Sequence, residues 1–164
     1  MFWNEKIDII QQTYSKDEFS VPTIGRKKIL RTIESKFIVR PESYYDSNEF
    51  LDVFMHWWKH FNKSYEVITS YHFDDFFDRI LHPQHHYWIA YELGGSVMIY
   101  KATPKVIKHL TEIGRTWTNT LYVCHLKFDY IIGLNIRHDG SHVIYAGNEK
   151  MKTQLSQLPK ADSL

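Results

Sequence analysis

Residues 85–110 read HHYWIAYELGGSVMIYKATPKVIKHL and carry the strongest fold signal in the chain. The runs on either side of Gly94-Gly95 are rich in aromatic and β-branched residues, which favour strands. The Gly-Gly pair between them is typical of a tight hairpin turn. Thr103-Pro104 then predicts a helix start, with threonine as the cap and proline at the first helical position. The stretch therefore predicts two antiparallel strands, 87–93 and 97–101, followed by a helix near 104–113.

The closing stretch, residues 121–147, reads LYVCHLKFDYIIGLNIRHDGSHVIYAG and continues the sheet. Asp139-Gly140 is a signal for a two-residue hairpin turn. That turn would pair Arg137 with His142 and would place both on one face with Asn135. The stretch predicts the strands Leu121–His125, Tyr130–Arg137 and His142–Ala146.

The first half of the chain is predominantly helical in pattern. Apolar residues recur at helical spacing in four segments, which predicts four helices. One strand, 65–71, is predicted among them from its content of valine, isoleucine, threonine and tyrosine. The expected helices are 3–14, 25–37, 48–61 and 74–81.

Helices followed by strands, with one helix between the strands, favour an α+β fold over alternating βα units. We predict an antiparallel sheet of about five or six strands with helices packed on one face. A single domain is expected over residues 1–150, with a frayed tail over 151–164.

The composition limits the disulfides that the chain can form and indicates the compartment in which it is expected. The chain has 164 residues with one cysteine, Cys124, so no disulfide can form within it. Its first residues resemble no secretory signal, and no apolar run is long enough for a membrane span. We therefore expect a cytoplasmic protein.

Charge is unevenly distributed, although the net charge is only +1. Residues 1–40 carry a net charge of +3, residues 41–100 a net charge of −6, and residues 101–164 a net charge of +4. The acidic middle segment either solvates helix surfaces or forms a face for a basic partner.

Ten histidines raise the question of a metal site. His82, His85 and His86 are close in sequence, but His85 and His86 are adjacent at a strand entry and should point to opposite sides. We predict no metal and no cofactor. By the same geometry, Cys124 and its neighbour His125 should diverge, so the cysteine is expected to be a small core residue.

The final hairpin offers an alternative chemistry. Arg137 beside His142, with His138 at the turn, could bind or cleave a phosphodiester. The polar residues are equally typical of the solvated face of an antiparallel sheet.

The segments 85–110 and 121–147 resemble a strand–turn–strand–helix unit and the closing strands of small bacterial proteins encoded beside polymorphic toxins, including the LXG class. Such proteins act as immunity proteins. This chain departs from them in an extra turn at 136–141, so no residue role is transferred. The resemblance implies a protein that neutralises a toxin by tight binding, with a nuclease as the natural partner.

We accordingly predict a non-enzymatic antitoxin whose partner is a cognate protein toxin, without direct contact to nucleic acid or a membrane. The alternatives are a small phosphodiesterase or nuclease-like enzyme using Arg137, His138 and His142, and a ligand-binding regulatory domain. Contacts with a basic toxin surface are expected from carboxylates of the acidic segment: Glu42, Asp46, Glu49, Asp52, Asp74, Asp75 and Asp78.

Overall fold

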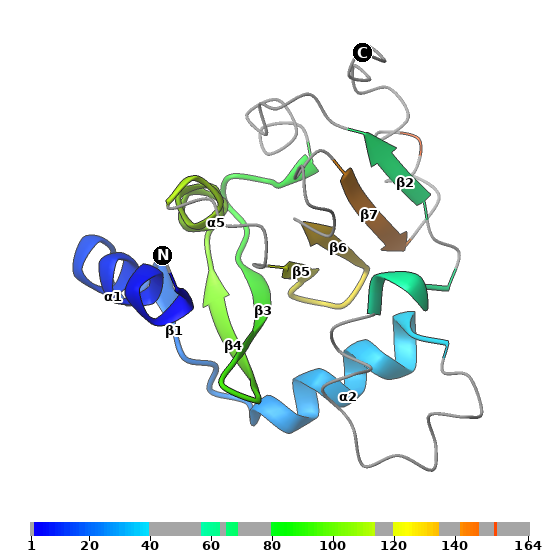
Figure 1. The fold of residues 1–164 in the computed structure, drawn as a ribbon, viewed down its shortest axis with the longest axis horizontal. Coiled ribbons are helices and arrows are strands. Elements are labelled where there is room, and N and C mark those ends of the chain that lie inside the picture. Colours follow the sequence, from blue (N-terminus) through cyan, green and yellow to red (C-terminus); the bar gives the residue numbers. More distant parts are fainter. Residues whose placement is uncertain are drawn as a thin grey trace.

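The structure is a computed structural model and describes residues 2–39, 57–62, 65–68, 80–113, 120–134, 142–147 and 153. For residue 58 and for segments 65–68 and 142–146 it describes the course of the backbone alone. These residues form a single mixed α+β domain (Figure 1). The helices are α1 (Trp3–Thr13), α2 (Arg26–Phe37), the 3₁₀ turn η2 (Trp57–Lys59) and α5 (Pro104–Glu112). The strands are β1 (Phe19–Ser20), β2 (Tyr65–Ile68), β3 (Tyr87–Leu93), β4 (Ser96–Ala102), β5 (Leu121–His125), β6 (Tyr130–Leu134) and β7 (His142–Gly147).

The strands form one antiparallel sheet in the order β1-β4-β3-β5-β6-β7-β2. Among the described residues it has seven strands. The two-residue β1, which the sequence did not predict, pairs with the end of β4. Strand β3 lies between β4 and β5, so the chain crosses over β3 through α5. The predicted antiparallel sheet, with a helix near residues 104–113 packed on it, is confirmed.

The β3–β4 hairpin turns where the Gly-Gly pair predicted it. Leu93 lies opposite Ser96, and both intervening residues have positive φ, 56° at Gly94 and 84° at Gly95. Two such residues in a two-residue loop give the type I′ turn whose twist matches that of the flanking strands. The glycines therefore fix the register of the whole hairpin.

The second predicted hairpin has a different register. A two-residue turn at Asp139-Gly140 would place Gly133 opposite Ala146, whereas the structure pairs Gly133 with Ile144. In the described part of this hairpin the predicted register was therefore wrong by two residues. Residues 135–141 lie outside the described part of the chain.

Helices cover both faces of the sheet, which corrects the prediction of one covered face. Side chains from α1 and α5 pack with one set of strand residues, which includes Ile89, Val123 and Ile132. The helix α2 packs with the alternate set, which includes Trp88 and Ile131. The physical reason is visible in the sequence: β3, β5 and β6 bury four or five successive residues, and a strand buried on both faces is apolar at consecutive positions.

Other predicted elements are confirmed to differing extents. The helices at 3–14 and 25–37 are present as α1 and α2, within one or two residues at their ends. Thr103 precedes α5 as predicted, but its hydroxyl makes no capping hydrogen bond. The predicted helices at 48–61 and 74–81 lie largely outside the described residues, and of the predicted tail only residue 153 is described.

Candidate functional site

The seven carboxylates proposed for partner contact lie outside the described residues, as do Arg137 and His138. Of the predicted hairpin site only the backbone of His142 is described, at the start of β7, where it pairs with Ile68. The acidic face and the hairpin chemistry therefore remain predictions. The described residues instead bring together two other polar groupings, a histidine–tyrosine row at one end of the sheet and a basic face on α2.

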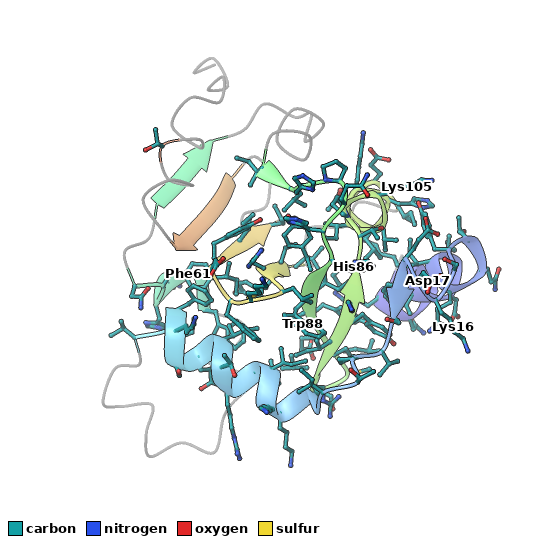
Figure 2. All side chains as sticks on the ribbon, turned by 180° about the vertical axis from the view of Figure 1, so that it is seen from behind. Lys16, Asp17, Phe61, His86, Trp88 and Lys105 are labelled. Carbon is teal, nitrogen blue, oxygen red and sulfur yellow. The ribbon has the colours of Figure 1, made fainter. Side chains whose placement is uncertain are left out.

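Of the three histidines considered for a metal site, the adjacent His85 and His86 diverge, as predicted. The His86 ring lies 2.6 Å from the backbone oxygen of Asp17, measured from Nε2 (Figure 2). His85 instead stacks on His82, with 4.2 Å between the ring centroids. Within the part of the chain that the structure describes, no three metal-ligating side chains converge.

The histidine–tyrosine row consists of Tyr87 on β3, His125 at the end of β5 and Tyr130 at the start of β6. Tyr87 and His125 are cross-strand partners, and the rings of His125 and Tyr130 stack with 5.2 Å between centroids. The Tyr130 hydroxyl donates to the Tyr87 hydroxyl oxygen (3.1 Å), which also accepts from the backbone N–H of His82 (2.9 Å). Three strands and the loop before β3 thus meet at one imidazole, which His85 approaches edge-on.

His125 faces two competing partners at Nδ1. The backbone N–H of Lys127 donates to Nδ1 (3.3 Å), which requires the nitrogen to be unprotonated. A carboxylate oxygen of Asp129 lies 3.4 Å from the same atom and favours a proton there. Burial lowers the pKa of His125; Asp129 opposes this, while His85 and Lys127 add to it. Loss or gain of the Nδ1 proton therefore exchanges one partner for the other.

The turn that holds this histidine is strained. Phe128, between Lys127 and Asp129, has a φ of 61°, a conformation that is uncommon for a bulky residue and often accompanies function. Its N–H donates to the His125 carbonyl oxygen (2.8 Å). The strained residue closes the turn that places both competing partners at Nδ1.

Cys124 lies on the opposite side of the sheet from the row. It is buried with the α2 side chains, and its Sγ donates to the backbone oxygen of His125 (3.4 Å). Burial raises the pKa of the thiol, and a thiol held protonated is a poor nucleophile. The prediction that Cys124 is a core residue is confirmed.

The basic face belongs to α2. The helix buries Ile29, Ile33 and Phe37 against the sheet and exposes its five cationic side chains. Nitrogen-tipped side chains extend from α2 away from the sheet (Figure 2). Within the described ranges, no carboxylate pairs with these cations. Arg26 contacts the sulfur of Met98, and Lys36 donates to the backbone oxygen of Phe128. The five are Arg26, Lys27, Lys28, Arg31 and Lys36.

Two adjoining hollows flank the start of α2. The first is open and lies along the helix, against Lys27, Lys28, Arg31 and Ser35. The second, of about 280 Å³, is formed by the segment that precedes the helix and by β4. That volume is at the small end of ligand pockets, so it suits one side chain rather than a whole ligand. It is formed by residues 21–26 and 98–100.

Lys6 is a buried cation that the sequence analysis missed. It is 2% exposed, its Nζ lies 5.0 Å from the centroid of the Trp3 ring, and burial lowers its pKa. The signal was available, because Lys6 falls on the helical stripe of Trp3, Ile7 and Ile10. A cation–π contact of this kind offsets part of the cost of burying the ammonium group.

No protein family, curated protein or solved structure matches this chain in the three comparisons that we made. None of the described helices is long and apolar enough to cross a membrane.

Proposed function

We propose that this protein is an immunity protein (antitoxin) of the cytoplasm, which neutralises a cognate protein toxin by stoichiometric binding. The observation that carries the proposal is the exposed surface around α2, where five exposed cations adjoin exposed aliphatic side chains. Interfaces with other proteins combine such apolar positions with a charged rim. The resemblance of residues 85–110 and 121–147 to proteins encoded beside toxins supplies the class, and a nuclease is the proposed partner.

The test is co-expression with the product of the gene immediately upstream. We expect that product to arrest growth alone, to be neutralised by this protein, and to co-purify with it as a complex of fixed stoichiometry. An upstream product that is neither toxic nor bound would overturn the proposal.

The acidic segment is proposed as a further contact with the toxin. Reversing Asp74, Asp75 and Asp78 to lysine should slow association if carboxylates steer a basic toxin surface, and salt should shrink the difference. Unchanged association kinetics would remove this contact and leave the immunity role standing.

A second candidate function rests on the histidine–tyrosine row. An imidazole with a carboxylate 3.4 Å away and a second histidine beside it has the groups that acid–base cleavage of a phosphodiester needs. The purified protein would then cleave an RNA oligonucleotide without any partner. Substituting His125→Ala should abolish the cleavage, and Arg26→Gln at the start of α2 should leave it unchanged.

A further inference from the structure

The start of α2 contradicts what helix stability favours. Its first three residues are Arg26, Lys27 and Lys28, and its first turn holds no acidic residue. Backbone N–H groups give a helix a positive N-terminal end, so cations in the first turn are unfavourable there. Lys27 and Arg31 are four residues apart, a spacing at which like charges repel on a helix surface. The cations thus weaken the helix that carries them.

Packing, rather than local sequence, holds α2 in place. Ile29, Ile33 and Phe37 are each less than 5% exposed and lie against the sheet with Trp88 and Ile131. The capping position is Gly25, which has no side chain to accept a hydrogen bond from the first turn. The well-packed apolar face of α2 compensates for the unfavourable charge in its first turn. Proteins break local rules of helix stability in this way mainly at functional sites.

Exposed aliphatic residues immediately precede these cations. Val21 is 69% exposed and Ile24 is 45% exposed, and both border the small hollow, which also includes Met98. The guanidinium of Arg26 lies 3.6 Å from the sulfur of Met98, so the apolar hollow and the basic face are continuous. An apolar side chain entering this hollow would have cations on one side of it.

We propose that this surface binds an acidic protein segment. One apolar side chain of that segment seats between Val21, Ile24 and Met98, and neighbouring carboxylates of the same segment meet Lys27 and Arg31. The inference deepens the proposed function and rests on it only in taking the partner to be a protein. Nucleic acid fits less well, because aliphatic residues offer no stacking surface for bases and Phe37, the aromatic residue of α2, is buried.

The test uses labelled peptides in place of the unidentified partner. The probe is a short peptide with one leucine flanked by aspartates and glutamates, and its control has alanine in place of leucine. Binding is measured by fluorescence anisotropy, and the site is located from NMR chemical shifts. We expect the leucine peptide to bind at α2 and the alanine peptide to bind several-fold more weakly.

The matched variants carry equal changes of charge. Lys27→Glu with Arg31→Glu should weaken peptide binding by roughly tenfold or more. Lys16→Glu with Lys105→Glu makes the same change in charge near α1 and α5, far from α2 (Figure 2), and should have little effect. Val21→Ser leaves the charge unchanged, so it tests the hollow independently of the cations, and it should also weaken binding.

Equal weakening by the two charge-reversed pairs would overturn the proposal, as would tighter binding of an RNA or DNA oligonucleotide at α2. Circular dichroism verifies that each variant is folded. Because the peptides need no toxin, failure here is distinguishable from failure of the immunity role. A toxin that binds the α2 variants as well as the wild type would refute this surface alone.

Discussion

The helices α1 and α2 cover opposite faces of the same sheet and begin in opposite ways. The first turn of α1 contains Glu5, whose carboxylate accepts a hydrogen bond from the Phe2 N–H at 2.7 Å. The first turn of α2 contains three cations and follows a glycine. An acidic residue at this position complements the positive end of the helix, and a cation opposes it. The start of α1 follows the rules of helix stability, whereas α2 keeps a surface that stability does not explain.

The comparison of α1 with α2 predicts that burial of their apolar side chains stabilises the protein equally on both faces of the sheet. Ile10 of α1 and Ile33 of α2 are at most 1% exposed, so each Ile→Ala substitution should lower the free energy of unfolding by about 2–5 kcal/mol. Chemical denaturation measures both values. Ile24→Ala, at a partly exposed position before α2, is the control and should change stability by less than about 0.5 kcal/mol. A loss for Ile33→Ala as small as that of the control would mean that α2 is only loosely attached.

A smaller effect is expected in how the free energy of unfolding depends on pH, and it arises from His125 on the face that α1 and α5 cover. Burial lowers the pKa of His125 below the ordinary histidine value of 6.5, so the unfolded chain takes up this proton before the folded protein does. Stability should therefore fall as the pH drops below about 6.5, and above that value His125 should contribute no slope. The measurement is the free energy of unfolding of the wild type minus that of His125→Gln between pH 5 and 8, since the difference removes the other histidines.

Asp129 supplies the control for this titration. Its carboxylate opposes the effect of burial on His125, so Asp129→Asn should lower the histidine pKa further and deepen the loss of stability in acid. Greater wild-type stability in acid, relative to His125→Gln, would show that the ion pair outweighs burial.

The sheet and its hairpin were predictable because their signals are local. Gly94-Gly95 supplies the positive φ angles of a type I′ turn, and residue patterns in 85–110 and 121–147 mark the strands. The placement of helices on both faces is also encoded in the sequence, because β3 and β5 are apolar at consecutive positions. The prediction of helices on one face was wrong because it assumed that the other face is solvated.

The histidine–tyrosine row could not be predicted in the same way. Tyr87 and His125 are distant in sequence and meet only because β5 pairs with β3 after the crossover through α5. Strand order depends on long-range packing that no local pattern specifies. Lys6, in contrast, was accessible from helical periodicity alone.

The smallest expected effect tests the central claim most directly, namely that the charge of α2 is kept at a cost to stability. Lys27→Glu places a carboxylate in the first turn and four residues before Arg31, which is the favourable orientation for an ion pair. We predict that its free energy of unfolding at low salt exceeds that of the wild type by about 0.5–1 kcal/mol, with a smaller gain at high salt. A lower free energy of unfolding than the wild type would contradict the account, because it would show that Lys27 serves the fold.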